Sequence, residues 1–496
     1  MIRHSIRLQP LGKVLKVNDQ TPLIDVLHEF GVEFPCGGRG TCGKCKVRLL
    51  EGEIEIQAVH RQRLGTLGLS GDYRLACFSA VTNDITLEIE QFNHLILADE
   101  TEFDFTPREG FGIAVDVGTT TLVTQLVDLS TARIMAVETM LNPQVKFGSD
   151  LISRIQASLD GHGSELTRMI RSAIGKMIRQ MLRKNDVEIQ QVVLVGNTVM
   201  QLIFSDCDVS PLSAYPFHTK NLGLKSFNAG ELNWKFKVTG QVNFYPSIGS
   251  FVGSDILAGI VATGLHHKKN VTALIDLGTN GEIVVGNCDR IVCASTAAGP
   301  AFEGANISMG MRAVTGAISS LKLDNRQVEA VVIGNTSPKG ICGSALIDAV
   351  AIFRKLELIG VFGEINSGEE YISLPGRVKL AQRDINEFQL AKAAIAAGLT
   401  ILVDQLSIGL TDISELYIAG GFGNYINIEH AVKTGVIELP ADKIHKMGNT
   451  ALIGAKMFLF SDPSDQDDIL AKTKLINLEG DSSFQDIYID KMLFSE

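Results

Sequence analysis

The chain opens with two short runs in which apolar and polar residues alternate, "HSIRLQP" and "GKVLKV". Such alternation is typical of half-buried strands, so the two runs predict a β-hairpin. The stretch "TPLIDVLHEFG" predicts a helix with Thr21 as N-cap, Pro22 at its first position and Gly31 after its end. "KCKVRLLEG" and "DITLEIE" predict two further strands. We therefore expect one small domain over residues 1–91.

After this domain the pattern changes twice. Residues 92–110 mix charges with Pro107 and have no clear period, which indicates a linker. From Phe111 onward, short apolar β-like runs that end in glycine turns alternate with amphipathic helices, as in α/β folds. Within this region "GIAVDVGTTTLVTQLVD" at 112–128 matches "TALIDLGTNGEIVVGN" at 272–287. Both read as strand, Asp-x-Gly-Thr, strand, which indicates a duplicated domain.

The two matching turns carry candidate phosphate-binding chemistry. A turn with Gly-Thr after the strand presents backbone N–H groups and hydroxyls to phosphate oxygens, and two such turns could clamp a triphosphate. The aspartates would hold the hydration shell of Mg²⁺ and orient an attacking water. One Asp-x-Gly-Thr alone is weak evidence, because Asp-x-Gly is common in hairpins. The residues concerned are Asp116, Gly118, Thr119 and Thr120 in the first turn, and Asp276, Gly278, Thr279 and Asn280 in the second.

A third glycine-rich segment follows another predicted strand, in "SELYIAGGFGNYI" at 414–426. Gly420, Gly421 and Gly423 would leave a flat surface on which adenosine can pack. Taken alone, the same run is also typical of a tight strand–helix turn. Two acidic residues near the turns are weaker candidates: Asp255 could face the Mg²⁺ site, whereas Glu282 is typical of a solvated strand face, with water orientation as the alternative.

The cysteines near the start have the spacing Cys36-x5-Cys42-x2-Cys45, with Cys77 far downstream. Plant-type 2Fe-2S proteins use C-x4-C-x2-C and a distant fourth cysteine, and the longer first gap resembles the adrenodoxin-like branch. Four glycines in the loop would supply positive φ angles and free N–H groups near sulfur: Gly37, Gly38, Gly40 and Gly43. A zinc ribbon would favour two C-x2-C pairs. We expect a 2Fe-2S cluster, and residues 1–91 resemble the β-grasp fold of 2Fe-2S ferredoxins.

The composition argues against some classes of binding partner. The net charge of −11 argues against nucleic acid or an anionic membrane surface. No apolar run is long enough to span a bilayer, and the N-terminus lacks a signal-peptide core. The predicted compartment is the cytoplasm, where clustered cysteines more often bind metal than form disulfides.

The three nucleotide-binding elements, in this order, resemble the actin-like ATPase superfamily over residues 111–460. The resemblance implies a domain over 111–496 with two RNase H-like lobes, lobe I at about 111–265 plus the C-terminal part and lobe II at about 271–447. "SFVGSDILAGIVATG" at 250–264 and "NTALIGAKMFLF" at 449–460 are similar to the two interlobe helices of that superfamily.

A ferredoxin domain fused to an actin-like ATPase resembles the reductive activators of corrinoid proteins. Further strings are similar to that family: "STAAGPAFEGANI", "KGICGSALIDAVA" and "INLEGDSSFQDIYIDKMLF". The resemblance implies ATP-dependent one-electron reduction of a corrinoid protein, from Co(II) to Co(I), for a methyltransferase or O-demethylase system, with an external electron donor. Longer members carry an extra middle domain, which we expect to be missing here, so no dimerisation is inferred. No additional cysteine cluster for a 4Fe-4S centre is present.

Three other functions remain open from the residues alone. The first is a nucleotide-binding electron-transfer or redox-sensing protein without ATP turnover. The second is an activator of another low-potential enzyme, analogous to the activators of 2-hydroxyacyl-CoA dehydratases. The third is a sugar or acid kinase with a fused ferredoxin domain.

Overall fold

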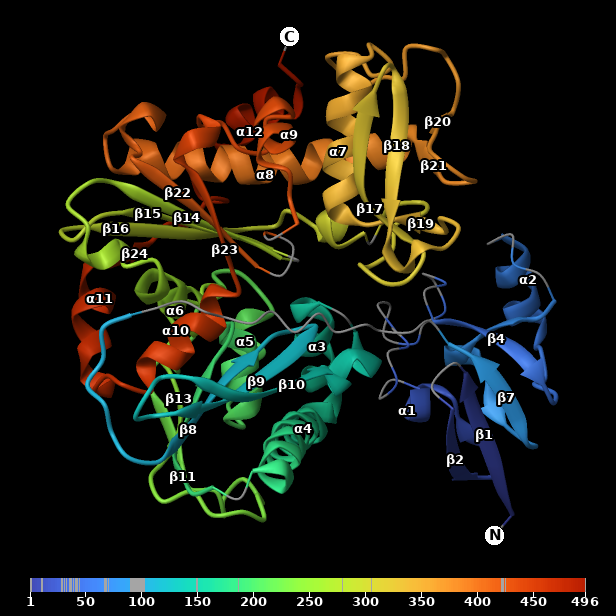
Figure 1. Cartoon of the computed structure of the whole chain (residues 1–496), viewed down its shortest axis with the longest axis horizontal. Helices are drawn as coiled ribbons and strands as arrows, with labels where there is room; N and C mark the ends of the chain where they lie inside the picture. The colour runs from blue at the N-terminus through green and yellow to red at the C-terminus, as the bar shows by residue number, and fades with distance from the viewer. Residues whose placement is uncertain are drawn as a thin grey trace. The chain divides into compact units, whose positions relative to one another are not determined.

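The computed structural model describes most of the chain as two compact units (Figure 1). One unit comprises Met1–Ile96 and Pro107–Phe244, and the other comprises Leu97–Thr106 and Tyr245–Glu496. The described residues are 2–495 except 10, 11, 28, 29, 31, 33, 35–37, 39, 41, 42, 44, 67, 68, 70, 90–102, 149, 186, 279, 305, 421, 422 and 424. Among them, no helix is long and apolar enough to cross a membrane.

The N-terminal region is built on a five-stranded sheet with the order β2-β1-β7-β4-β5. Strands β1 and β2 form the predicted antiparallel hairpin, and β7 lies parallel to β1. Ile6, Leu8 and Leu87 from these strands are fully buried in the core of this sheet. The strands are β1 (Arg3–Gln9), β2 (Lys13–Asn18), β4 (Lys46–Glu51), β5 (Tyr73–Leu75) and β7 (Ile85–Glu88), and the helices are α1 (Ile24–Leu27) and α2 (Ala58–Thr66).

The predicted start of the first helix at Thr21 is wrong. Thr21 and Pro22 form the short strand β3 (Thr21–Pro22), which pairs with β6 (Ala80–Val81), and α1 begins only at Ile24. The Thr21 hydroxyl donates to the Asn18 carbonyl oxygen at 2.7 Å, so it does not cap a helix. A sequence pattern for a cap has here been overridden by a strand pairing with residues sixty positions away. The expected helix end at Gly31 lies outside the described residues.

A six-stranded sheet follows, with the order β10-β9-β8-β11-β13-β12. Its first three strands are antiparallel neighbours, and β11 runs parallel to both β8 and β13. The strands are β8 (Phe111–Val117), β9 (Thr121–Asp128), β10 (Ile134–Leu141), β11 (Ile189–Val195), β12 (Lys225–Phe227) and β13 (Val242–Phe244), and the helices are α3 (Leu151–Ala157), α4 (Gly163–Lys184) and α5 (Thr198–Phe204).

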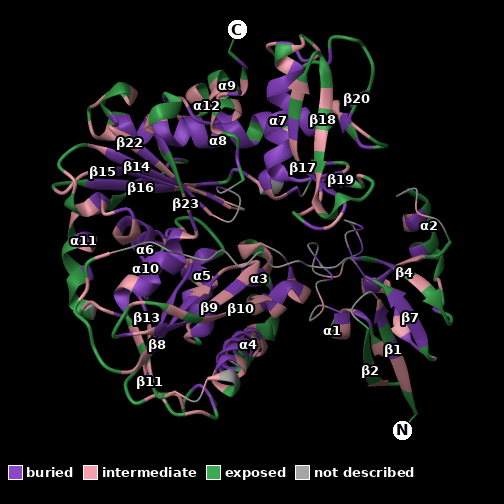
Figure 2. Cartoon of the chain, viewed as in Figure 1, coloured by how far each residue is buried: buried purple, intermediate pink, exposed green. Residues whose placement is uncertain are grey.

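The second unit contains another six-stranded sheet, with the order β23-β22-β14-β15-β16-β24. Its strands are β14 (Thr272–Leu277), β15 (Gly281–Gly286), β16 (Ile291–Thr296), β22 (Glu415–Ala419), β23 (Ile444–Gly448) and β24 (Thr473–Leu475). Smaller sheets are formed by β17 (Ala317–Asp324), β18 (Gln327–Val332) and β19 (Gly340–Ile341), and by β20 (Tyr371–Ser373) and β21 (Lys379–Ala381). The helices are α6 (Ser254–Ala262), α7 (Gly343–Lys355), α8 (Gln382–Gln405), α9 (Ile428–Lys433), α10 (Thr450–Phe458), α11 (Gln466–Lys472) and α12 (Phe484–Met492). Helix α8 packs on β15 and β16 of this sheet, whereas α7 packs on β17 of the smaller sheet, and both helices are largely buried (Figure 2).

The two six-stranded sheets share one connectivity, which confirms the duplication predicted from the sequence. The order β10-β9-β8-β11-β13 in one unit corresponds to β16-β15-β14-β22-β23 in the other. In each, an antiparallel meander of three strands is extended on the side of its first strand by two parallel strands. The strand order therefore agrees with the predicted fold class, an α/β protein with a small N-terminal sheet and a duplicated larger sheet.

The two helices predicted as interlobe helices, α6 and α10, cross closely within the second unit. A Cβ on Gly454 of α10 would lie 2.2 Å from the Ala258 carbonyl oxygen of α6. Because only glycine fits at this distance, the backbones of the two helices touch directly. Asn449 caps α10 by accepting a hydrogen bond from the Leu452 N–H at 2.8 Å.

The described end of the predicted linker packs on the second unit. The rings of Phe103 and Phe105 lie 5.5 and 4.9 Å from the ring of Phe460. Lys456 places its ammonium 5.4 Å above the Phe103 ring. These aromatic contacts anchor the segment just before Pro107, where the chain passes to the other unit.

The side chain of Gln125 on β9 is buried without a hydrogen-bond partner among the described residues, which leads to a prediction about stability. Both polar atoms of the fully buried Gln125 side chain lack a hydrogen-bond partner among the described residues. Since an unsatisfied buried amide costs about 1–3 kcal/mol, we expect Gln125→Leu to raise the free energy of unfolding by about 1–2 kcal/mol. The measurement is the thermal or urea unfolding transition of this unit.

The matched control is Gln144→Leu in the same unit. The Gln144 amide donates to the Leu166 carbonyl oxygen and accepts from Arg154, so its loss should lower stability. Equal destabilisation by both variants would contradict the assignment of Gln125 as an uncompensated group.

Candidate functional site

Two of the four predicted cluster ligands lie side by side. Strand β4 follows Cys45 directly, and its pairing with β5 brings Lys46 opposite Leu75. The Ala76 N–H donates to the Cys45 carbonyl oxygen at 2.9 Å, which fixes the turn that carries Cys77. The two sulfur atoms are 3.3 Å apart, far longer than a disulfide bond and close enough for one metal centre. Cys36 and Cys42 lie outside the described residues.

The glycines of this loop behave as predicted where the structure describes them. Gly38, Gly40 and Gly43 have φ angles of 80°, 72° and 69°. At Gly40 there is a second constraint, because an added Cβ would lie 2.1 Å from the ring of Phe78, next to Cys77. The Phe78 ring can therefore lie against the cysteine loop only because residue 40 is a glycine and has no side chain. Gly37 lies outside the described residues.

The first predicted phosphate turn joins β8 to β9, with Asp116 opposite Val123 in the strand pair. Two asparagines that the sequence analysis missed hold this turn. Asn142 donates its side-chain amide to the Gly118 carbonyl oxygen at 2.9 Å, and Asn197 donates to the Thr119 hydroxyl at 2.9 Å. Their sequence signal is their position, since each caps a helical turn immediately after a strand.

The second predicted phosphate turn joins β14 to β15 and carries a pair of acidic side chains. Asp276 and Glu282 are directly opposite each other in the antiparallel pair, so both side chains project from the same face of the sheet. Ser295 on β16 donates its hydroxyl to Glu282 at 3.2 Å. Glu282 is half-buried and faces a second carboxylate, so the expectation of a solvated strand face is wrong.

A third carboxylate joins this pair from the first turn of α6. Burial raises the pKa of Glu282 well above its usual value, and the negative charges of Asp255 and Asp276 raise it further. The Ser295 hydrogen bond opposes this shift without cancelling it. The arrangement concentrates negative charge that a divalent cation would neutralise. Among the described residues, the structure contains no group of three or more acidic, histidine or cysteine side chains that could hold a metal ion.

The start of the glycine-rich segment after β22 lies beside Asp276. Strand β22 runs parallel to β14, with Ala419 beside Asp276. The next residue, Gly420, has a φ of 91°, and an added Cβ would lie 2.7 Å from Oδ1 of Asp276 and 2.6 Å from the Leu277 carbonyl oxygen. Close contact between Asp276 and the glycine segment therefore requires the absence of a side chain. Gly423 donates its N–H to the Gly420 carbonyl oxygen at 3.0 Å.

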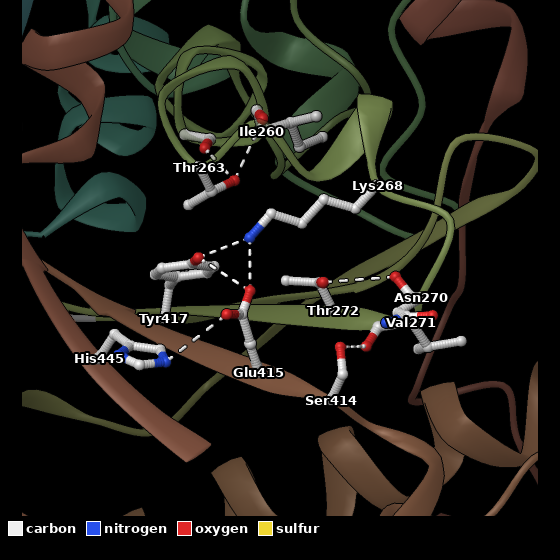
Figure 3. A network of polar contacts seen from close by, with 11 residues as sticks. Ile260, Thr263, Lys268, Asn270, Val271, Thr272, Ser414, Glu415, Tyr417 and His445 are labelled. Carbon is white, nitrogen blue, oxygen red and sulfur yellow. Dashed lines mark hydrogen bonds and ion pairs between the residues drawn. The ribbon is translucent and has the colours of Figure 1, made fainter. Parts of the chain in front are cut away.

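The other end of β22 is fastened by a polar network (Figure 3). Lys268, on the connection from α6 to β14, donates to Glu415 at 2.5 Å and to the Tyr417 hydroxyl at 2.6 Å. Tyr417 also donates to Glu415 at 3.0 Å, and His445 on β23 stands 3.9 Å from the same carboxylate. Burial acts to lower the pKa of Lys268, but its bonds to Glu415 and Tyr417 raise it overall. The network ties together the elements that carry Asp255, Asp276 and Gly420.

The residues predicted for the nucleotide site thus fall into three groups. In the second unit, the structure brings Asp276, Gly278, Asn280, Gly420 and Gly423 to the ends of two neighbouring strands. In the first unit, Asp116, Gly118, Thr119 and Thr120 form the corresponding turn. Thr279 and Gly421 lie outside the described residues.

Three family models match the chain in succession. They are described as the 2Fe-2S iron-sulfur cluster binding domain over residues 6–82, the RACo middle region over 111–268, and the C-terminal domain of RACo, the ASKHA domain, over 270–496. The middle-region model covers the residues that we assigned to the first lobe.

Curated relatives and a solved structure match almost the whole chain. The corrinoid activation enzyme RamQ of Eubacterium limosum is 30% identical, covering 98% of this chain and 98% of its own length. The Co(II) methylated amine-specific corrinoid protein reductase of Methanosarcina barkeri is 28% identical, covering 74% and 73%. A solved reductive activator for a corrinoid, iron-sulfur protein superposes with a TM-score of 0.69 at 27% identity, covering 99% and 98%.

The contact between Gly420 and Asp276 predicts a specific loss. Gly420→Ala should displace the aspartate and the second phosphate turn, and so weaken binding of Mg-ADP by about tenfold or more. Gly368→Ala is the control, because Gly368 has a similar φ of 74° but no atom within 4 Å of an added Cβ. Calorimetric titration of both variants decides the matter, and equal affinities would contradict the role of the glycine contact.

The raised pKa of Glu282 predicts a pH dependence. Without nucleotide and divalent cation, Glu282 keeps its proton at pH values where the unfolded chain has lost it. Stability should therefore fall as the pH rises from the ordinary value of 4.5 towards the raised pKa. Glu282→Gln, which resembles the protonated form, should flatten this fall when the melting temperature is measured in EDTA between about pH 5 and pH 8. The exposed Glu429→Gln is the control; parallel profiles for the parent and the Glu282 variant would overturn the prediction.

Proposed function

This chain belongs to the reductive activators of corrinoid proteins, and we propose that it reduces a partner corrinoid protein from Co(II) to Co(I) in a step coupled to ATP. One observation carries the proposal. A 2Fe-2S region and a duplicated ATPase-like fold are joined in a chain whose relative over 98% of its length is a corrinoid activation enzyme. The partner would serve a methyltransferase or O-demethylase system, and the electron would come from an external donor.

The four cysteines Cys36, Cys42, Cys45 and Cys77 would hold the cluster. The adjacent sulfur atoms of Cys45 and Cys77 fit this assignment. When bound, a 2Fe-2S cluster supplies single electrons at low potential, roughly −400 mV for the plant type. The chain positions Cys45 and Cys77 by pairing β4 with β5, and the Phe78 ring lies against Gly40 of the cysteine loop.

ATP is needed if the cobalt couple lies below the cluster. An uphill step of about 100 mV for one electron requires roughly 2.3 kcal/mol. A two-state ATPase supplies this amount when its two conformations differ in affinity by a few kcal/mol. The nucleotide would be bound by the backbone of both phosphate turns: Asp116, Gly118, Thr119 and Thr120 in one, and Asp276, Gly278, Thr279 and Asn280 in the other. Gly420, Gly421 and Gly423 would line the adenosine pocket.

Mg²⁺ would be held at the carboxylates. Asp116 and Asp276 would orient its water shell, and Asp255 and Glu282 add negative charge around Asp276. Burial, together with the charges of Asp255 and Asp276, raises the pKa of Glu282, and a cation there would offset those charges, so metal binding would lower this pKa. Such a protein would work in the cytoplasm beside its corrinoid partner.

The decisive experiment is anaerobic. We would mix the reduced protein with Co(II) corrinoid proteins of the same organism and follow the Co(I) absorption band with and without Mg-ATP. We expect Co(I) only with ATP, its loss in Cys77→Ala, and its retention in Cys288→Ala, where the half-buried cysteine lies outside the cluster loop.

Two results would contradict the proposal in different ways. Equal formation of Co(I) without ATP would reduce the ATPase part to a regulatory role. If ATP is hydrolysed and the cluster is intact but no corrinoid protein is reduced, the chain activates a different low-potential acceptor.

A further inference from the structure

Three consecutive carbonyl groups of the first phosphate turn accept hydrogen bonds from Asn142 and Arg154, whose side chains both contact the Met200 sulfur. The Gly118 oxygen accepts from the Asn142 side chain at 2.9 Å, and the Thr120 oxygen accepts from the Asn142 backbone N–H at 2.8 Å. Between them, the Thr119 oxygen accepts a hydrogen bond from Nη2 of Arg154 on α3. Three consecutive carbonyls are thus held by two residues, and the central one is held by a guanidinium.

The direction of these carbonyls determines the direction of the N–H groups. In a planar trans peptide the C=O and the following N–H point in opposite directions. The bonds to Asn142 and Arg154 therefore turn the N–H groups of Thr119 and Thr120 to the opposite side of the turn. Consecutive N–H groups that point the same way form an anion-binding concavity.

Arg154 is an unusual residue to use as such a clamp. It is fully buried, and its Nη1 donates to Gln144 at 3.1 Å and lies 3.2 Å from the Met200 sulfur. Its Nε has no hydrogen-bond partner, and within the described part of the chain no carboxylate is within ion-pair distance of it. Asp150 acts on it only at longer range and is itself bonded to Ser153.

The positive charge of the buried Arg154 guanidinium is balanced only in part by nearby negative charge. Burial lowers the pKa of Arg154 to about 9, partly opposed by Asp150, so the guanidinium remains protonated at neutral pH. A buried charge without an ion partner is costly, and an apolar residue of similar length would serve packing alone better. An anion bound on the other side of the turn would supply the missing compensation.

We propose that Arg154 is a positioning residue for the phosphate bound at the first turn: it fixes the Thr119 peptide, and the bound phosphate in return balances its buried charge. This inference rests on the proposed nucleotide function and adds a residue to it that no motif marks. Arg154 acts through the Thr119–Thr120 peptide and does not itself touch the phosphate in this account.

The test measures the affinity for Mg-ADP by calorimetry and the melting temperature without nucleotide. In Arg154→Met we expect the dissociation constant to rise about tenfold or more, the usual effect of losing a charged hydrogen bond. Arg154→Lys keeps the charge but loses the planar fork, so its affinity should fall between the parent and the methionine variant.

Arg171→Met is the matched control. Arg171, on α4 of the same unit, also donates to a backbone carbonyl, that of Phe204 at 2.7 Å, and packs on two aromatic rings away from the turn. We expect its affinity for Mg-ADP to stay at the parent value, whatever its melting temperature.

The outcomes separate three possibilities. A parent chain that binds no Mg-ADP overturns the nucleotide function together with the inference. A parent that binds, with Arg154→Met binding equally well, overturns the inference alone, as does a lower melting temperature at unchanged affinity. If Arg154→Met yields no folded protein, the decision passes to Arg154→Lys, and a parent-like dissociation constant there overturns the role of the fork.

Discussion

Repulsion between negative charges is the constraint that shapes the candidate nucleotide site. The chain carries a net charge of −11 and gathers Asp255, Asp276 and Glu282 at the place where a triphosphate is expected. Attraction from a basic surface is therefore unavailable. The structure offers three local features instead: peptide N–H groups at the strand turns, carboxylates that would attract a divalent cation, and one buried guanidinium behind the first turn. Each of these features acts over a short distance, so each requires that the sheets hold the residues concerned in place.

The duplicated sheets provide that placement, and the sequence was sufficient to predict them. In each unit the turn lies between the first two strands of a meander, and the next parallel strand ends beside it. The internal match between residues 112–128 and 272–287 predicted the two turns, and the strand before Gly420 predicted the third element. These predictions succeeded because apolar strands and glycine turns are local features. The contact of Gly420 with Asp276 then follows from the parallel pairing of β22 with β14.

The parts that could not be predicted depend on contacts between distant residues. Asn142, Arg154 and Asn197 reach the first turn from separate elements. The two asparagines are recognisable as helix caps after strands, but that position does not reveal that their side chains hold the turn, and nothing in the local sequence marks Arg154. The same reason explains why Thr21 does not cap a helix. Its local sequence fits a cap, but its backbone pairs with the distant Val81 in a short strand. Glu282 looked like a surface residue because periodicity reveals which face of a strand it occupies, but not which carboxylates stand opposite. The cysteine spacing predicted four ligands, and strand pairing accounts for the adjacency of Cys45 and Cys77.

The link between charge and conformation runs through α6. Asp255 lies in the first turn of this helix, close enough to Glu282 to raise its pKa, so any ligand that neutralises the acidic group also changes the forces on the helix. The helix is not free to relax alone, because its backbone touches α10 at Gly454 and its C-terminal connection is tied to β22 through Lys268. It also begins nine residues after Tyr245, where the second unit starts. Asp255 of the acidic group therefore lies on a helix that follows one of the points where the chain passes from one unit to the other.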